Sequence, residues 1–533
     1  MTNADLIVQM LRDAGARYAF GIPSGNVLPL LDALRRGGIE FVLTAHEGSA
    51  AFAAAVMGRL TGAPGVCLGT MGPGATNLAT GVGCAWLDRS PLVAITCNVP
   101  THQLGRRVQM VIDHHALFSP ITKATRPLRT GSVAATVHEA LGIAVSEPHG
   151  PVHLDLPEDV SLAEATEAPL AGVTRGCLGP APDADIERLG QLLREARRPA
   201  AVIGASTLRM AHPERLAAFV ERLGIPFATT TMAKGMIDED HPLSIGCIER
   251  ARRQVQRRFL RSADVVVGLG YDVIEVEYEQ WIGNVPLASV DSERVDADKT
   301  VNVVHEVVGD LDASLERMLR FAPGAYEWAP EDAMRQKQEF QEALRPSVAG
   351  FAPHHAIDVA RAVLPAEGVL AFDVGAHTHQ IASQWTAHAP GDFLVTNGWS
   401  SMGFGIPAAI AAKLARPERP VLCLLGDGCF QMTCGEVAVA QRLGLPLPIL
   451  VFDDGWLTLI ELKQMKRKFA VYGTELQRGE RRDAPAHYFG VPAVTVRGAD
   501  ALERELKKAF QAKGPTVIQA VVDHAAYGET VYD

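Results

Sequence analysis

Two acidic positions near the C-terminal end of the chain carry the clearest chemical signal. The Gly-Asp-Gly triplet centred on Asp427 follows the apolar run 421–425, and Asp454 follows the apolar run 447–452. This spacing indicates a strand, a turn, a helix and a second parallel strand, so both carboxylates leave the carboxyl ends of strands, where open α/β sheets bind ligands. Two hard oxygen donors there can hold one Mg²⁺ and leave positions for diphosphate oxygens and water. An ordinary structural turn is the competing interpretation.

A second carboxylate, Glu47, lies in the first tenth of the chain. It is followed by a stretch of mostly small residues, 48–55, which predicts a helix. A carboxylate at a helix N-terminus is favoured by the helix dipole, and this is the ordinary interpretation. The chemical alternative is a desolvated carboxylate that holds or moves a proton for a bound cofactor.

Seven motifs then occur in order along the chain, and together they resemble the acetolactate synthase branch of thiamin-diphosphate (ThDP) enzymes of the pyruvate oxidase and decarboxylase type. The resemblance covers essentially the whole chain. The motifs are the segments 20–25, 45–47, 72–77, 121–123, 231–235 with 240–242, 401–409, and the unit from Gly426 to Asp454. The family unit usually ends in Asn-Asn, whereas here it ends in Asp453 and Asp454.

Apolar runs alternate with alanine-rich helical runs along most of the sequence, which favours an α/β fold. Pro- and Gly-rich linkers at 163–185 and 322–353 separate three parts. We expect three doubly wound parallel-sheet domains of the ThDP-enzyme type: a pyrimidine-binding domain at 1–165, a central domain at 186–322 and a diphosphate-binding domain at 353–533. Segments 48–74 and 402–428 echo each other, which indicates either a diverged duplication or chance similarity of alanine-rich sequence.

The resemblance implies that the third domain holds the diphosphate and its metal. Mg²⁺ would be bound by Asp427, Asp454 and a backbone carbonyl at Trp456, and Met402 would support the V-shape of ThDP. His379 has no family counterpart and is expected at the surface. The remaining cofactor contacts expected in this domain are Gly375, Ala376, His377, Ser401, Gly426, Gly428, Cys429 and Leu457.

The first domain would supply proton chemistry. The resemblance implies that Glu47 hydrogen-bonds N1′ of the aminopyrimidine, and that Gln109 faces the substrate. The pair His114 and His115 suits acid–base chemistry near neutral pH, although a solvent-facing loop pair is an equal alternative. Further cofactor contacts are expected at Pro23, Gly72 and Asn77, and substrate contacts at Ser24, Gly25, Asn26, Leu459, Ile460 and Lys463.

Three departures from the synthase pattern limit the assignment. Lys463 stands where the anabolic enzymes carry a tryptophan, and Glu158 replaces their usual lysine. The segment 264–275 lacks the arginine of the FAD-binding synthases and is similar to the catabolic, flavin-free enzymes. We therefore expect no FAD. Lys463 and Glu158 indicate either a polar entrance to the acceptor site or ordinary charged residues on the surface.

The function implied is ThDP- and Mg²⁺-dependent decarboxylation of a 2-oxo acid, most simply pyruvate, with carboligation to a second carbonyl compound. Alternatives are non-ligating decarboxylation with release of an aldehyde, other ThDP lyase or acyltransferase chemistry, and a catalytically silent ThDP-binding protein. In similar enzymes the site lies between two chains, so we expect a homodimer or homotetramer.

Composition agrees with such an enzyme. The 533 residues are 47% hydrophobic and 21% charged, as in an ordinary globular protein. The net charge of −11 argues against a nucleic-acid-binding surface. No apolar run is long enough to span a membrane, no secretory signal opens the sequence, and the eight cysteines fit no zinc or disulfide pattern. We expect a cytoplasmic protein without nucleic-acid or membrane partners.

Overall fold

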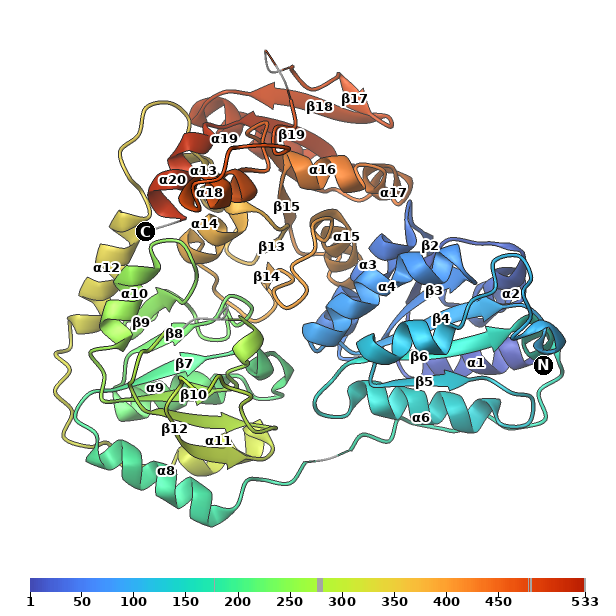
Figure 1. Ribbon diagram of the computed structural model, residues 1–533, viewed down its shortest axis with the longest axis horizontal. Helices are drawn as coiled ribbons and strands as arrows, with labels where there is room; N and C mark the ends of the chain where they lie inside the picture. The colour runs from blue at the N-terminus through green and yellow to red at the C-terminus, as the bar shows by residue number, and fades with distance from the viewer. Residues whose placement is uncertain (177, 276–280, 478, 480–481, 532–533) are drawn as a thin grey trace.

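The computed structural model describes residues 1–176, 178–275, 281–477, 479 and 482–531. It contains three α/β domains, each built on its own sheet, and this confirms the predicted fold class. Figure 1 shows the first domain on the right, the central domain at lower left and the third domain above it. The linker after the first domain runs along the bottom of the view to the central domain.

The first domain is a six-stranded parallel sheet in the order β2-β1-β3-β4-β6-β5. Helices cover both faces, so its strands are nearly continuous apolar runs. Its elements are α1 (Asn3–Asp13), β1 (Tyr18–Gly21), α2 (Leu28–Gly37), β2 (Glu40–Leu43), α3 (Glu47–Thr61), β3 (Gly65–Thr70), α4 (Pro73–Leu87), β4 (Leu92–Asn98), α5 (His114–Phe118), β5 (Ala124–Pro127), α6 (Val133–Val145), β6 (Pro151–Pro157) and α7 (Glu158–Leu162).

The central domain has a six-stranded parallel sheet in the order β12-β11-β10-β7-β8-β9. The stretch expected as the second linker differs from a plain connection, because it contains α12, which packs against β9. The elements are α8 (Asp183–Glu195), β7 (Pro199–Ile203), α9 (Glu214–Leu223), β8 (Phe227–Thr229), β9 (Ser244–Cys247), α10 (Arg253–Leu260), β10 (Val265–Leu269), β11 (Leu287–Asp291), β12 (Val303–Val308), α11 (Leu311–Met318) and α12 (Asp332–Ala343).

The third domain has a seven-stranded sheet in the order β14-β13-β15-β16-β19-β18-β17, parallel except for the β17–β18 pair. Its elements are α13 (Pro353–Val363), β13 (Val369–Phe372), α14 (Ala376–Gln384), β14 (Phe393–Leu394), α15 (Gly405–Ala415), β15 (Val421–Gly426), α16 (Asp427–Thr433), α17 (Glu436–Arg442), β16 (Pro448–Asp453), α18 (Thr458–Lys466), β17 (His487–Tyr488), β18 (Val491–Val496), α19 (Ala499–Gln511), β19 (Thr516–Val521) and α20 (Tyr527–Thr530).

The first and third sheets repeat one topology. Leaving out β17, both place their strands in the order second, first, third, fourth, sixth, fifth along the chain. This shared order favours duplication over chance similarity. It also means that equivalent loops of the two domains leave equivalent strand ends.

The first and third domains share one apolar core. Helix α3 lies beside α15 between the two sheets, and α4 packs against α3 (Figure 1). Residues 50–55 of α3, which are alanines except for Phe52, are buried and belong to the same cluster as Phe404 and Ile406 at the start of α15. Small side chains also let α3 and α4 pack closely within the first domain: a Cβ added at Gly81 of α4 would come within 2.4 Å of the Ala51 Cβ.

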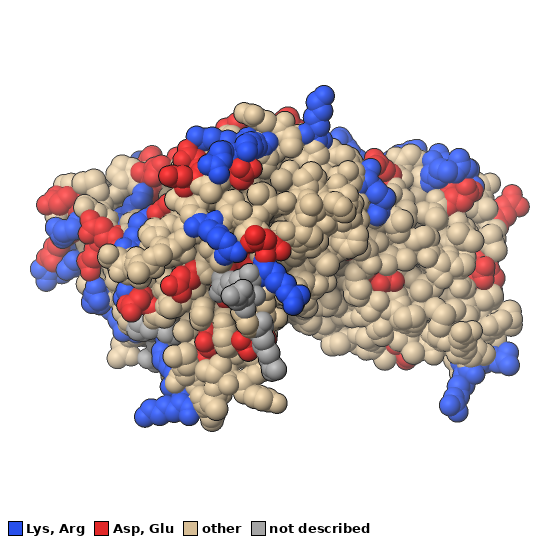
Figure 2. All heavy atoms as spheres, turned by 90° about the horizontal axis from the view of Figure 1, so that it is seen from above, with Lys and Arg blue, Asp and Glu red and all other residues tan. Residues whose placement is uncertain are grey.

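Figure 2 shows the molecule from above, with acidic and basic side chains interspersed at the left and a broad area with few charges at the right. No described helix is long and apolar enough to cross a membrane. The seven cysteines that the structure describes are all unpaired, and six of them are buried.

Candidate active site

Loops at the carboxyl ends of the third-domain strands enclose a cavity of about 320 Å³. They follow β13, β15 and β16, three neighbouring parallel strands. Most of the third-domain residues expected to contact cofactor or substrate line this cavity, and Ser401 does not. The lining residues include Gly375, Ala376, His377, His379, Ser400, Met402, Gly426, Asp427, Gly428, Cys429, Asp454, Trp456, Leu457, Leu459, Ile460 and Lys463.

The carboxylates of Asp427 and Asp454 sit together on one wall of the cavity. Asp427 accepts from the backbone N–H groups of Gly428 and Gly455, each at 2.8 Å. Asp454 accepts from the Trp456 N–H at 2.9 Å and from the Thr458 hydroxyl at 2.8 Å. Burial, and then the charge of Asp454, raise the pKa of Asp427 well above the ordinary range of an aspartate. A divalent cation would relieve this repulsion.

Another part of the cavity lining suits a phosphate. A Cβ at Gly375 or Gly426 would come within 2.6 Å or 3.0 Å of the His377 ring, so only glycine keeps this wall open. The Nε2 atom of His377 is buried without a hydrogen-bond partner among the described residues. Burial, with a smaller effect of His379, lowers the pKa of His377 to about 3. An orphaned imidazole nitrogen and a glycine cradle in the same cavity as two carboxylates fit a metal-bound diphosphate.

The loop that carries Met402 is held by a carboxylate that the motif analysis did not single out. Asp373 is fully buried at the end of β13 and accepts from the N–H groups of Gly403 and Gly405. In the sequence, only the position of Asp373 directly after the apolar run 369–372 points to this role. A Cβ atom added at Gly428 would lie 3.0 Å from the Leu457 side chain and 3.1 Å from the Met402 side chain. These two side chains therefore form the apolar floor of the cavity.

In the first domain, Glu47 is the first residue of α3 and is 8% exposed. Asn77 donates from Nδ2 to Glu47 Oε2 at 2.9 Å, which brings two of the predicted residues together. His46 caps the helix by accepting from the Gly48 N–H at 3.0 Å. The carboxylate is thus held in a fixed orientation at the sheet edge.

A residue of the third domain holds the backbone that leads into Glu47. The buried carboxylate of Glu436, on α17, accepts from the N–H groups of Ala45 and His46 at 3.1 Å. Burial raises the pKa of Glu436. This contact joins positions about 390 residues apart, so no local sequence pattern predicts it.

His114 is buried beside the Gly72 loop. Its Nε2 accepts from the Gly72 N–H at 3.2 Å, and its Nδ1 lies 3.2 Å from Asp155 Oδ1. Gly72 must be glycine, because it has φ +60° and an added Cβ would come within 2.3 Å of the Met110 carbonyl oxygen. The ring of His114 therefore positions this loop.

His115 is half-exposed and begins a chain of polar contacts into the domain. Its Nδ1 lies 2.7 Å from the Thr125 hydroxyl, which lies 2.7 Å from His153 Nδ1, and His153 Nε2 lies 2.8 Å from the Thr96 hydroxyl. Burial lowers the pKa of His153 to about 3, so this ring is neutral. The two predicted histidines line a separate first-domain cavity of about 650 Å³.

The other first-domain predictions lie at the same sheet edge but form no common pocket. Pro23, Ser24 and Gly25 follow β1, and Asn26 donates to the Asn98 carbonyl at 3.3 Å and to Glu158 at 3.4 Å. Gln109 is exposed. In the third domain, the Ser401 hydroxyl donates to the Met402 carbonyl at 3.0 Å.

His379 corrects an expectation. It is not a surface histidine: its side chain is only 13% exposed, it lines the third-domain cavity, and its Nδ1 lies 3.0 Å from Glu249 of the central domain. The motif analysis missed Glu249 because nothing in its local sequence points to the third domain.

The two halves of the predicted site remain apart within one chain. No described first-domain residue lines the third-domain cavity, and Glu47, Gly72 and Asn77 are absent from its walls. Exposed apolar side chains border both halves: Leu104 and Ile112 in the first domain, and, in the third, Met465 near the end of α18 with Phe469 and Tyr472 after it.

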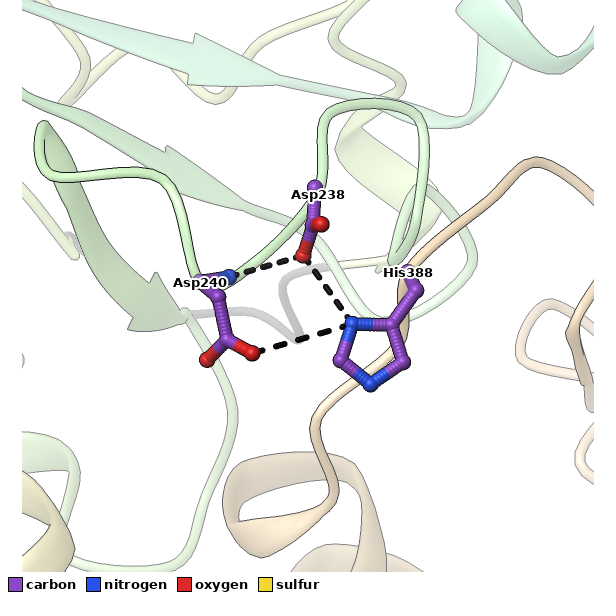
Figure 3. A group of neighbouring side chains, drawn as sticks. All are labelled: Asp238, Asp240 and His388. Atoms are coloured by element: carbon purple, nitrogen blue, oxygen red, sulfur yellow. Dashed lines mark hydrogen bonds and ion pairs between the residues drawn. The ribbon is translucent and has the colours of Figure 1, made fainter. Parts of the chain in front are cut away.

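One further cluster of potential metal ligands lies where the central and third domains meet. Figure 3 shows His388 pointing at Asp238 and Asp240, with Nδ1 at 3.1 Å and 3.8 Å from their carboxylates. The ammonium of Lys337 lies 3.6 Å from Asp240. Lys337 pairs with Asp240, and His388 contacts both carboxylates, so this exposed cluster links the two domains through polar contacts.

Comparison with known proteins agrees with the fold and the cavity. The three parts of the chain match the models of the thiamine pyrophosphate enzymes: the N-terminal TPP binding domain at residues 1–117, the central domain at 186–318 and the C-terminal TPP binding domain at 373–520. The chain therefore belongs to the thiamine pyrophosphate enzyme family, as an acetolactate synthase-like, ThDP-dependent enzyme.

Several acetolactate synthases match over nearly their whole length. A probable acetolactate synthase large subunit of Methanococcus aeolicus is 30% identical over 98% of this chain and 92% of that protein. The acetolactate synthase of Bacillus subtilis is 28% identical over 98% of this chain and 93% of that protein. The catabolic acetolactate synthase of Raoultella terrigena is 28% identical over 98% and 95%.

Proposed function

We propose that this enzyme uses ThDP and Mg²⁺ to decarboxylate a 2-oxo acid, with pyruvate the simplest, and joins the remaining fragment to a second carbonyl compound. The observation that carries the proposal is the third-domain cavity, which the carboxylates of Asp427 and Asp454 line together with a glycine cradle and His377, whose Nε2 is orphaned. The full-length likeness to acetolactate synthases supports carboligation as the outcome.

When bound, ThDP supplies a carbon nucleophile and accepts the electron pair released with carbon dioxide. The protein holds and orients it. Asp427, Asp454 and the Trp456 carbonyl are the proposed Mg²⁺ ligands, a set of hard oxygens suited to that ion. Met402 and Leu457, which line the cavity, would provide an apolar surface for the bound cofactor.

Glu47 is the proposed proton-handling residue. Its carboxylate would accept a hydrogen bond from the protonated N1′ of the aminopyrimidine and so stabilise the form of the ring that removes the C2 proton. The hydrogen bond that Asn77 donates at 2.9 Å orients one oxygen of the Glu47 carboxylate. Loss of the carboxylate charge would remove this stabilisation without emptying the diphosphate site.

The proposed complete site is formed by two chains. Within one chain the cavity wall lacks Glu47, and the borders of both halves expose apolar side chains, which is a common property of association surfaces. A symmetric dimer would bring the first domain of one protomer over the third domain of its partner and create two identical sites. Pairing of two such dimers would give a tetramer.

Release of an aldehyde is the second candidate outcome. His115 is half-exposed in a first-domain cavity and continues into a chain of threonine and histidine contacts. Such a chain could deliver a proton to a reacting carbon near the cavity. We propose Gln109, Ser24, Gly25 and Asn26 as substrate contacts in either case.

We also propose that the central domain binds no FAD. The carboxylate of Glu275 accepts from the N–H groups of Ala205 and Met232, at the ends of β7 and β8. A Cβ at Gly204 would come within 2.3 Å of the Gly270 carbonyl oxygen, so the loops after β7 and β10 are in contact. These loops mark the switch point where an open sheet would take a nucleotide. Absorbance near 450 nm in stoichiometric amount would contradict the proposal.

Product analysis tests the reaction. Purified protein is incubated with ThDP, Mg²⁺ and ¹³C-labelled pyruvate, and the carbon products are followed by NMR. Acetolactate is expected. Acetaldehyde alone would favour the second candidate, and no carbon dioxide release across a panel of 2-oxo acids would revive a silent ThDP-binding protein.

Free, mostly buried thiols fit the cytoplasmic location that we propose.

A further inference from the structure

The third-domain cavity has a positively charged end that the cofactor-holding residues do not use. Lys463 lines the cavity and is half-buried. Among the described residues, no carboxylate forms an ion pair with its ammonium group. A partly desolvated cation without a counter-charge is unfavourable unless a ligand supplies one.

The position of Lys463 on α18 separates it from the metal carboxylates. The helix begins at Thr458, whose hydroxyl donates to Asp454 at 2.8 Å. Lys463 follows five residues later, which is about 7.5 Å along the helix axis. Leu459 and Ile460 line the wall between them. The cavity thus has an anionic end for the metal, an apolar middle and a cationic end.

Neighbouring groups increase the positive character of this end. Burial, followed by repulsion from Arg250 and Arg467, lowers the pKa of Lys463. The nearby Glu249 does not offset this charge fully, because its carboxylate is engaged by the Thr231 hydroxyl at 2.7 Å, by His379 at 3.0 Å and by the Arg250 N–H. Its oxygens are therefore already engaged by other groups.

We propose that Lys463 binds an acidic group at the far end of the substrate, so that the preferred substrate is a 2-oxo acid whose tail ends in a carboxylate or a comparable anion. This inference rests on the proposed function, since it names the substrate class of the same site. Pyruvate, whose tail is a methyl group, leaves Lys463 without a partner. A dianionic substrate places one charge at the reacting end and the other on Lys463, with its carbon chain along Leu459 and Ile460.

A matched pair of substrates tests the proposal. 2-Oxoglutarate is compared with 5-methyl-2-oxohexanoate, in which an isopropyl group replaces the distal carboxylate. Carbon dioxide release is measured with each compound alone and with each as acceptor beside pyruvate. The wild-type enzyme should prefer 2-oxoglutarate in kcat/KM. Lys463→Met should reduce this preference roughly 10–100-fold, as expected for one charge-assisted hydrogen bond.

Two variants serve as controls. Lys463→Arg keeps the charge and should keep most of the preference. Lys513→Met makes the same exchange at an exposed lysine in the loop before β19, away from the cavity, and should change nothing. An unchanged preference in Lys463→Met would overturn the proposal. Weaker ThDP binding by this variant with the preference intact would also overturn it, and would assign Lys463 to the diphosphate.

Direct binding separates this inference from the proposed reaction. Calorimetric titration of the ThDP- and Mg²⁺-loaded protein with glutarate and with 5-methylhexanoate needs no turnover. The wild-type protein should bind glutarate more tightly, and Lys463→Met should lose the difference. If no 2-oxo acid is decarboxylated but glutarate binding depends on Lys463, the proposed reaction is refuted, whereas the anion site is supported. Equal binding of both acids by the wild-type protein would refute the anion site.

Discussion

At the scale of single residues, the paired carboxylates of Asp427 and Asp454 make the cofactor-free protein sensitive to pH. The pKa of Asp427 is raised in the folded state, so the folded protein binds more protons than the unfolded chain above pH 4. Its stability should therefore fall as the pH rises toward the raised pKa. Asp427→Asn should remove this loss and raise the free energy of unfolding at pH 8 by roughly 1–3 kcal/mol.

Denaturant unfolding of the cofactor-free protein at pH 5 and pH 8 measures this effect. Asp296→Asn, at an exposed aspartate, is the control and should have little influence. Mg²⁺ with ThDP should stabilise the wild-type protein more at pH 8 than at pH 5, because protons compete with the metal. Destabilisation by Asp427→Asn at pH 8 would show that the carboxylate is structural.

Glu47→Gln tests the proton-handling role. The amide can still receive the hydrogen bond from Asn77 but carries no charge to stabilise a protonated N1′. ThDP binding should persist, while turnover should fall by about two to four orders of magnitude, the range of general acid–base contributions. Exchange of the C2 proton of bound ThDP is the measurement, and a wild-type exchange rate in the variant would make Glu47 structural.

At the residue level, the sequence can predict which positions lie together where short spacing encodes geometry. Asp427, Asp454 and Gly375 each follow an apolar strand, so parallel pairing of β13, β15 and β16 brings them to one edge. Asp373, His379 and Glu436 could not be assigned in this way. Their roles depend on contacts between segments far apart in the chain, which local patterns do not encode.

At the scale of elements, α17 holds the start of α3 through one buried carboxylate. Glu436→Ala should leave the N–H groups of Ala45 and His46 without their acceptor and lower the free energy of unfolding by about 2–4 kcal/mol. Glu436→Gln keeps one acceptor and should cost less. Gln441→Ala, on the exposed side of the same helix, is the matched control.

Denaturation curves give these differences directly. Because the contact precedes Glu47, the C2 proton exchange of bound ThDP should slow in Glu436→Ala more than in Glu436→Gln. Equal stability of the alanine variant and the Gln441→Ala control would contradict the role assigned to Glu436.

At the scale of the whole molecule, the separated halves predict complementation between inactive chains. Glu47→Gln and Asp427→Ala each remove one half of the proposed site. A mixed dimer would pair one doubly altered site with one intact site, so activity should return to about a quarter of the wild-type level on random mixing of equal amounts, as the isologous arrangement requires. Activity after subunit exchange is the measurement, and its continued absence despite confirmed exchange would place both halves in one chain.

The shared core of the first and third domains has a consequence for how the protein is made. The alanine face of α3 packs against α15, which lies roughly 350 residues later in the chain. At a synthesis rate of about 5–20 residues per second, α15 is made some tens of seconds after this face of α3. The nascent N-terminal part therefore leaves the ribosome with an uncovered apolar surface, and chaperones should hold it until the last third of the chain has emerged.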